Sequence, residues 1–160
     1  DEGPWACVLD RQTGLLWENK SDNEGLHFAA ATYSRHDPAT KLGPAAAGSC
    51  VHADRKVFGC DSHAFVERVR AQRWCGRADW RLPTGDELSG LLHDTGFVGD
   101  PRIVHGYFQH TGRYPYLSAD LRRDARGQHE ILLVHFGSGE KIWLPISRVA
   151  RLRLVSGRQP

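Results

Sequence analysis

Four cysteines, Cys7, Cys50, Cys60 and Cys75, constrain what this chain can fold into more than any other feature. None of them lies in a CxxC pair, so their spacing disfavours a zinc site. An even number of cysteines in a chain of 160 residues favours two disulfides and an oxidising compartment. We therefore expect two cross-links in the folded domain.

A predicted helix limits which cysteines can pair. The stretch DSHAFVERVRAQRW, residues 61–74, lies between Cys60 and Cys75 and begins with two candidate N-caps, Asp61 and Ser62. Its apolar side chains recur at helical spacing, at Phe65, Val66 and Val69. About twelve helical residues rise roughly 18 Å, whereas the Cα atoms of a disulfide lie within about 7 Å of each other. Cys60 and Cys75 should therefore not pair.

Two of the three possible connectivities remain after this exclusion. We favour Cys50–Cys60 together with Cys7–Cys75, which would tie the first strand to the residues after the helix. Residues 34–59 are rich in Gly, Pro, Ala and Ser and predict a long loop, which the first of these disulfides would pin.

The remaining patterns predict two hairpins and a closing strand. CVLDRQTGLLWE, residues 7–18, places two short apolar segments around a turn that ends at Gly14. EILLVHFGSGEKIWLPI, residues 130–146, does the same around its central Gly-Ser-Gly, and its first strand is apolar on both faces, as a central strand would be. SRVARLRLVSG, residues 147–157, predicts a strand that carries leucines on one side and arginines on the other.

The stretch CGRADWRLPTGDEL, residues 75–88, predicts a rigid entry into a second helix. Thr84 and Glu87 have the spacing of a capping box, in which each side chain satisfies a free backbone donor of the other residue. The helix should continue along an apolar stripe formed by Leu88, Leu91 and Leu92, and Gly96 lies just past its expected end. We interpret the junction as structural, and its residues are Trp80, Arg81, Leu82, Pro83, Thr84 and Glu87.

Composition indicates one domain, residues 1–160, of ordinary globular type, with 40% hydrophobic and 25% charged residues. No apolar run approaches the roughly 20 residues of a membrane span, so we expect no membrane insertion. The sequence begins at Asp1 and contains no Met, so we expect it to be a piece of a longer exported protein.

Basic residues concentrate near the end of the chain. Residues 113–160 hold nine Lys/Arg against four Asp/Glu, a local charge of +5. Of the 21 basic residues in the chain 17 are Arg, whose planar guanidinium suits two-point contacts with carboxylate, sulfate or phosphate. We hypothesise an anion-binding surface formed by Arg122, Arg123, Arg126, Lys141, Arg148, Arg151 and Arg153, of which the first three would lie on a loop.

The motif "CG..DWRLPT..EL" resembles the hallmark of the bacterial Lcl C-terminal domain family, which is named for a collagen-like adhesin. CVLDRQTGLLWE resembles the opening "C..D..TGL.WE" of that family, and VARLRLV at Val149–Val155 resembles its closing strand. Further matches occur at Thr32–Ser34 and Cys60–Val66, so the resemblance covers nearly the whole chain.

This resemblance implies an α+β, C-type-lectin-like fold, with two helices packed on small antiparallel sheets, paired terminal strands, long loops and two disulfides. It also implies a secreted or surface-displayed bacterial module, and at least one member is an adhesin that binds sulfated glycosaminoglycans. The motif "RLPT..E" recurs in formylglycine-generating enzymes as well. Those enzymes use a reactive cysteine pair late in the chain, whereas the last cysteine here is Cys75.

Catalysis and metal binding have little support in the sequence. There is no GxSxG motif, no phosphate-binding loop and no calcium-dependent sugar-binding motif of the lectin kind. His105 and His110 are five residues apart, which fits neither helical ligation nor a zinc knuckle. We expect no enzyme activity, cofactor, metal or nucleic-acid partner.

Two functions remain in consideration. One is an adhesion domain that binds a glycan or another cell-surface ligand through loops or an arginine face. The other is a structural or protein-interaction module displayed with other subunits on a pilus, fibre or surface complex. A fold of this kind supports either function, because its loops carry the specificity.

Overall fold

The computed structural model describes residues 5–50 and 59–158. Within these residues the chain forms two α-helices, one short 3-10 helix and eight strands, which confirms the α+β class. The helical elements are α1 (Ser62–Ala71), η1 (Trp74–Gly76) and α2 (Gly85–Ser89). The strands are β1 (Cys7–Leu9), β2 (Leu16–Glu18), β3 (Tyr33–Ser34), β4 (Pro115–Arg123), β5 (His129–His135), β6 (Lys141–Pro145), β7 (Val149–Ala150) and β8 (Val155–Ser156).

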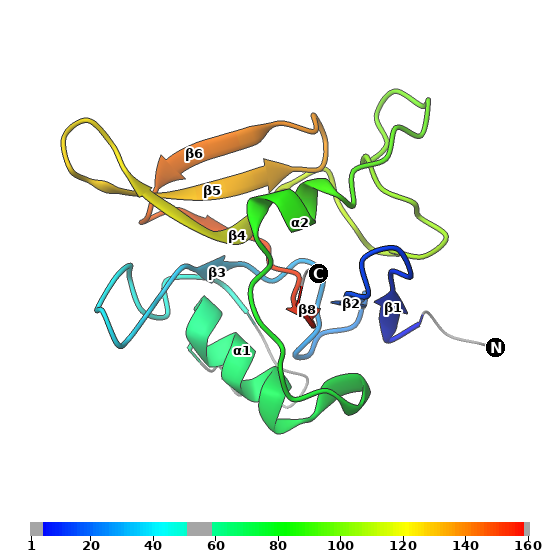
Figure 1. Cartoon of the computed structure of the whole chain (residues 1–160), viewed down its shortest axis with the longest axis horizontal. Helices are drawn as coiled ribbons and strands as arrows, with labels where there is room; N and C mark the ends of the chain where they lie inside the picture. Colours follow the sequence, from blue (N-terminus) through cyan, green and yellow to red (C-terminus); the bar gives the residue numbers. More distant parts are fainter. Residues whose placement is uncertain (1–4, 51–58, 159–160) are drawn as a thin grey trace.

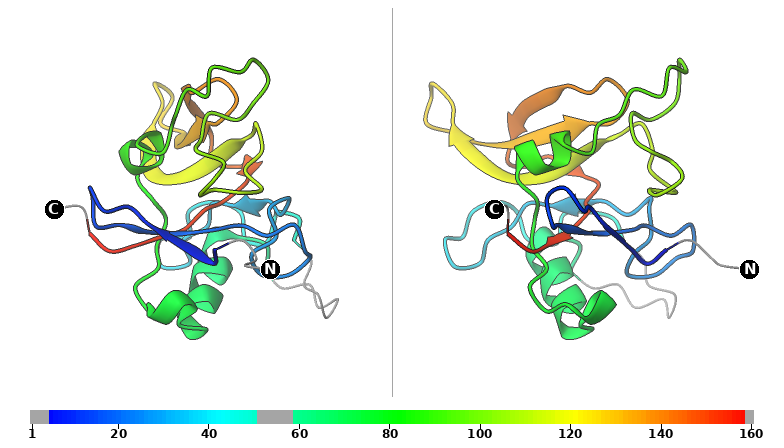
Figure 2. Two further views of the ribbon diagram at one scale, coloured as in Figure 1. Left: turned by 90° about the vertical axis from the view of Figure 1, so that its right-hand side faces the viewer. Right: turned by 45° about the vertical axis from the view of Figure 1, so that its right-hand side comes forward.

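The strands form three small antiparallel sheets, in the orders β1–β2–β8, β3–β7 and β4–β5–β6. Figure 1 shows the β4–β5–β6 sheet on one side of the molecule and α1 on the other, with the short strands between them, and the views in Figure 2 agree. Trp17 of β2 pairs with Val155 of β8, so the N-terminal hairpin joins the C-terminal strand. Among the described residues, no helix has the length and apolarity that a bilayer span requires.

β5 is the central strand of the β4–β5–β6 sheet, as its apolar sequence predicted. Its residues from Ile131 to Val134 are at most 5% exposed, because both faces of the sheet are covered. α2 lies against Leu132 on one face, where a Cβ at Gly85 would overlap the Leu132 side chain. On the other face Ile131 and Leu133 join the core cluster that includes the buried side chains of α1.

α1 begins where the sequence predicted. Asp61 is the N-cap, and its side chain accepts a hydrogen bond of 2.9 Å from the backbone N–H of Ala64. The stripe predicted to be buried is buried: Phe65, Val66 and Val69. The helix ends at Ala71, three residues before the predicted end, because Arg73 takes a left-handed backbone conformation with φ near 49°.

Both favoured disulfides form. Cys7 joins Cys75 with a Cα–Cα distance of 6.6 Å, and Cys50 joins Cys60 with a Cα–Cα distance of 5.7 Å. Cys60 precedes α1 and Cys75 follows it, so the helix separates them as the geometric argument required. The long loop predicted over residues 34–59 falls partly on residues 51–58, which lie outside the described residues.

Three local predictions were wrong. α2 ends at Ser89, so Leu91 and Leu92 follow the helix, and their side chains still pack on the core. Arg122 and Arg123 belong to β4, because the strand extends into the predicted loop to pair with β5. The predicted closing strand divides into β7 and β8, which pair with β3 and β2 in different sheets.

Peptide mapping under non-reducing conditions tests the cross-links. We expect only two linked peptide pairs, one containing Cys7 and Cys75 and the other Cys50 and Cys60. Replacing the first pair by serine should lower the free energy of unfolding by about 2–5 kcal/mol, measured by chemical denaturation, because the unfolded chain regains its freedom. A peptide that joins Cys60 to Cys75 would contradict both the pairing and the helix between them.

Candidate functional site

The junction around Trp80 is packed into the interior. Trp80 is fully buried, and its Nε1 donates to the carbonyl oxygen of Trp74 at 3.0 Å. Its own carbonyl oxygen accepts from Nε of Arg70 at 2.8 Å. After it, the half-buried Leu82 packs on the core, and the carbonyl oxygen of Pro83 accepts the backbone N–H of Ala119 at 2.7 Å.

Arg81 and Glu87 form the polar half of this junction. Two hydrogen bonds of 2.8 Å join their side chains, and the remaining guanidinium donors of Arg81 bond the carbonyl oxygens of Gly157 and Leu82. Thr84 and Glu87 form the predicted capping box. Burial opposes ionisation of Glu87, but the hydrogen bonds from Arg81 and Thr84 outweigh it, so the pKa of Glu87 lies below its ordinary value. Every donor of Arg81 is used within the molecule, which supports a structural role.

Four of the predicted anion-binding residues lie at one end of the β4–β5–β6 sheet. Arg122 and Arg123 end β4, Arg126 lies in the turn to β5, and Arg148 follows β6. Glu130 of β5 pairs with both Arg122 and Pro145, which places the start of β5 and the end of β6 at this same end. We call this set Arg122, Arg123, Arg126 and Arg148 the basic end. Figure 1 shows the β4–β5 turn projecting away from the other elements.

The side chains of the basic end differ in how far they are neutralised. Nε of Arg122 lies 2.9 Å from a carboxylate oxygen of Glu130, and the guanidinium carbon of Arg122 lies 4.4 Å from the ring centre of Trp143. Among the described residues, the side chain of Arg123 donates only to the carbonyl oxygen of Gly127, at 3.2 Å. Within residues 5–50 and 59–158, the exposed side chains of Arg126 and Arg148 have no hydrogen-bond or ion-pair partner.

The carboxylate of Asp124 lies in the β4–β5 turn near these arginines, but it bonds the backbone of the turn. Asp124 accepts the backbone N–H groups of Arg126 and Gln128 through one oxygen, both at 2.8 Å. Such a contact is typical of an Asx turn, in which the carboxylate supports the backbone. Three guanidiniums of the basic end, those of Arg123, Arg126 and Arg148, therefore have no carboxylate partner among the described residues.

Two of the predicted residues lie elsewhere. Lys141 begins β6, at the opposite end of the strand from Pro145, and its Nζ lies 2.6 Å from the carboxylate of Asp86. The guanidinium carbon of Arg151 lies 3.7 Å from the ring centre of Tyr114, and Arg151 is half-buried. These two side chains therefore do not extend the basic end.

Arg153 was predicted to lie on the arginine face, and this prediction was wrong. Arg153 is 1% exposed, and its guanidinium donates to the backbone oxygen of Glu18 at 2.6 Å and to Oγ1 of Thr111 at 2.7 Å. The expected alternation fails because the chain leaves strand geometry between β7 and β8, so Leu152, Arg153 and Leu154 are all buried. Burial of the charge is possible because internal oxygens satisfy its donors.

A buried ionic cluster surrounds Glu18, and the sequence analysis did not identify it. One carboxylate oxygen of Glu18 lies 2.7 Å from Nζ of Lys20 and 2.7 Å from Nδ1 of His27, and the other accepts the backbone N–H of Leu154 at 2.9 Å. Burial alone would raise the pKa of Glu18, but the charge of Lys20 and the contact with His27 outweigh it and lower the pKa to about 2. Burial lowers the pKa of Lys20, although Glu18 opposes that effect.

The only sequence signal of this cluster was the polar run Glu18-Asn19-Lys20 at the end of a predicted strand. Such a run is ordinarily a solvated loop. Nothing in the local sequence indicates that Glu18 is fully buried or that Arg153 lies beside it.

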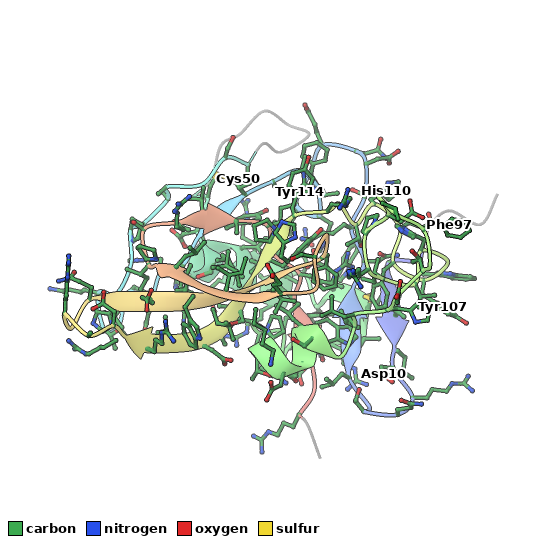
Figure 3. All side chains as sticks on the ribbon, turned by 90° about the horizontal axis from the view of Figure 1, so that it is seen from above. Asp10, Cys50, Phe97, Tyr107, His110 and Tyr114 are labelled. Atoms are coloured by element: carbon green, nitrogen blue, oxygen red, sulfur yellow. A yellow bond between two sulfur atoms is a disulfide. The ribbon has the colours of Figure 1, made fainter. Side chains whose placement is uncertain are left out.

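A second exposed surface lies on the loop between α2 and β4. Its large apolar side chains include Phe97, Val98 and Tyr107, which are 75%, 106% and 59% exposed. His105 lies exposed on the same loop. Seen from above in Figure 3, Phe97 and Tyr107 lie at the end of the molecule opposite the β4–β5 turn. No three His, Cys, Asp or Glu side chains of the described residues gather in a way that could hold a metal ion.

Comparison with known protein families shows to which family the chain belongs. A family model described as the Lcl C-terminal domain matches residues 6–156. The chain belongs to the Lcl C-terminal domain family. The match covers the first hairpin, the junction and β8 together, and so confirms the resemblance that the motifs indicated. No curated protein and no solved structure matches the chain significantly, and the C-type-lectin-like topology stays a prediction. The family and the two disulfides are consistent with an oxidising, extracytoplasmic location.

Truncation of Trp80 tests the structural role of the junction. We expect Trp80→Ala to lower the free energy of unfolding by about 3–5 kcal/mol, because it leaves a cavity in the core. Trp5→Ala is the matched control, since Trp5 is 52% exposed and its loss should change stability by only about 0.5 kcal/mol. Both are measured by urea denaturation. A stable Trp80→Ala protein that fails to bind a ligand would place Trp80 in a binding site instead.

The pH dependence of stability tests the charge of Glu18. Because its folded pKa, about 2, lies below its ordinary value of 4.5, ionised Glu18 stabilises the fold fully above about pH 4.5 and loses this effect as the pH falls towards 2. Glu18→Gln should cost about 3–5 kcal/mol at neutral pH, since Lys20 loses its buried counter-ion.

Denaturation across this pH range provides the measurement. The gap in stability between wild type and Glu18→Gln should shrink by roughly 3 kcal/mol between pH 4.5 and 2. The exposed Glu24 lies in the segment after β2, and Glu24→Gln serves as the control that should follow wild type. A gap that stays constant with pH would show that Glu18 is not the ionised partner of Lys20.

Proposed function

We propose that this domain is a non-catalytic adhesion module, displayed on a bacterial surface, that binds anionic glycans through its basic end. The observation that carries the proposal is the set of three guanidiniums, on Arg123, Arg126 and Arg148, that have no carboxylate partner among the described residues. They lie at the end of the sheet where the β4–β5 turn projects from the molecule (Figure 1), so a long polymer could reach them.

The chemistry of these side chains suits sulfate and carboxylate groups. A guanidinium presents a planar array of donors that can bond two oxygens of one anion. Arg122 adds a fourth guanidinium, which is held over Trp143 and is partly neutralised by Glu130. Several exposed arginines close together also raise the local concentration of a polyanion, and salt screens this effect.

The surface location rests on the two disulfides and the family. Disulfides persist in oxidising compartments outside the cytosol, and both cross-links are formed here. The partner on this proposal is a glycan of a host or neighbouring cell, with the domain presented by a longer surface protein.

One observation favours a second candidate function. Phe97 and Val98 are 75% and 106% exposed on the loop at the far end of the molecule from the β4–β5 turn. Adjacent exposed apolar side chains are a common feature of protein interfaces. A protein-interaction module within a pilus, fibre or other surface complex would use this loop in place of the basic end.

Retention on immobilised heparin at low and high salt distinguishes the two functions. We expect the wild type to be retained at low salt and released as salt rises, because the contacts are electrostatic. Arg122/Arg123/Arg126→Glu should abolish retention. The free energy of unfolding should fall by about 1 kcal/mol, since the variant loses one partly exposed ion pair, Arg122–Glu130, and the contact of Arg122 with Trp143.

The matched control is Arg11/Arg77/Arg158→Glu, which makes the same change in net charge at exposed arginines outside the basic end. This variant should keep most of the retention. If the wild type shows no salt-sensitive retention, or if both variants lose it equally, specific binding at the basic end is contradicted. Retention of partner proteins that depends on Phe97 and Val98 would then support the interaction module.

A further inference from the structure

A cavity of about 310 Å³ lies between the residues that lead into β1, the segment that follows β2, and η1. The side chains around it that matter here are Trp5, Lys20, Asn23, Glu24, His27 and Trp74. Its volume is at the lower end of the range typical of small-ligand sites. Neither the junction nor the basic end contributes to it.

Two tryptophans stand at this cavity because a disulfide brings their segments together. Cys7 and Cys75 are bonded, and Trp74 immediately precedes Cys75. Nε1 of Trp74 donates to the carbonyl oxygen of Ala6 at 3.3 Å, which fixes the indole against the lead-in to β1. Trp5 is 52% exposed, so an open aromatic surface faces the solvent at the mouth.

The buried ionic cluster supports the inner wall. His27 stacks on Trp74 with a ring-centre distance of 3.9 Å and an angle of 23° between the planes. Glu18 holds Nδ1 of His27 at 2.7 Å. The aromatic wall is thus fixed by a hydrogen bond to a fully buried carboxylate, and a ligand would meet a preformed surface rather than one that has to be ordered on binding.

The rim carries hydrogen-bonding groups that the fold does not use. The side chains of Asn23 and Glu24 are exposed and have no partner among the residues that the structure describes. An amide offers both donors and acceptors, and a carboxylate offers acceptors. Together, the amide of Asn23 and the carboxylate of Glu24 can hydrogen-bond adjacent hydroxyl groups, each of which is both a donor and an acceptor.

The charges around the cavity select against ionic ligands. On its inner side the buried Lys20 pairs with the carboxylate of Glu18. The buried Arg153, which donates to the backbone oxygen of Glu18, adds a second positive charge, so this side repels a cation. At the rim the carboxylate of Glu24 repels an anion. A ligand with a flat apolar face and many hydroxyl groups, but no charge, satisfies both conditions.

We propose that this cavity is a binding site for an uncharged sugar ring, which stacks on Trp5 and hydrogen-bonds Asn23 and Glu24. The site is separate from the basic end. Asn19, which also lines the cavity, donates to the carbonyl oxygen of Tyr107 at 3.1 Å. Figure 3 shows Tyr107 at the end opposite the β4–β5 turn, so a neutral sugar and an anionic polymer would engage opposite ends of one domain.

Saturation-transfer NMR with uncharged oligosaccharides tests this site. The probes are cello-, malto- and chito-oligosaccharides and lactose, each added to the folded, oxidised domain. We expect transfer to the ring C–H protons of at least one probe, with equal intensity at low and high salt, because stacking and hydrogen bonds to an uncharged ligand are weakly screened. Trp5→Ala should weaken binding about tenfold, and Asn23→Ala should weaken it as well.

Phe97→Ala is the matched control, because it removes an exposed aromatic ring that does not line the cavity, and it should bind like wild type. Both Trp5 and Asn23 are exposed, so their variants should fold, and this is checked by denaturation. The proposal is overturned if no probe receives saturation, if transfer persists unchanged in Trp5→Ala and Asn23→Ala, or if Phe97→Ala removes it equally. Binding that disappears at high salt would also overturn it, since it would identify a charged contact.

Discussion

The exchange of hydrogen bonds between Glu18 and the segment Arg153–Leu154 joins the two ends of the chain, and the rest of the structure depends on it. The carboxylate of Glu18 accepts the backbone N–H of Leu154, while the guanidinium of Arg153 donates to the backbone oxygen of Glu18. All of these groups are buried, so no water can replace a lost partner. The same carboxylate also holds Lys20 and His27, which couples the terminal strands to the segment after β2.

The groups that stabilise the fold are different from the groups that are available to bind a ligand. The buried cluster, the Arg81–Glu87 pair and the two disulfides use their polar and covalent capacity inside the molecule. The outward-facing features take little part in these contacts. They are the exposed arginines at the β4–β5 turn and a tryptophan-lined cavity at the other end. Such an arrangement suits a surface module, because loops and turns can change their ligand without disturbing the core.

Much of the fold could be predicted because its signals are local. The N-cap at Asp61, the capping box of Thr84 and Glu87, and the hairpin turn at Gly14 each depend on residues within a few positions. The basic end could be predicted only in part. Charge and residue type pointed to Arg122, Arg123, Arg126 and Arg148, but the same reasoning also included Arg153, which is buried.

The sequence by itself excluded a Cys60–Cys75 bond, because the helix between these residues keeps their Cα atoms too far apart. It left two connectivities, of which the structure forms Cys7–Cys75 with Cys50–Cys60. Only the tertiary structure decided which charges are buried. Arg153 contacts Glu18 across 135 positions of sequence, and Trp5 shares its cavity with Trp74 through a disulfide that spans 68. The free-energy cost of removing a charge from water depends on the partners that surround it. For Arg153 those partners come from distant segments, so its place in the core could not be inferred from its neighbours in the chain.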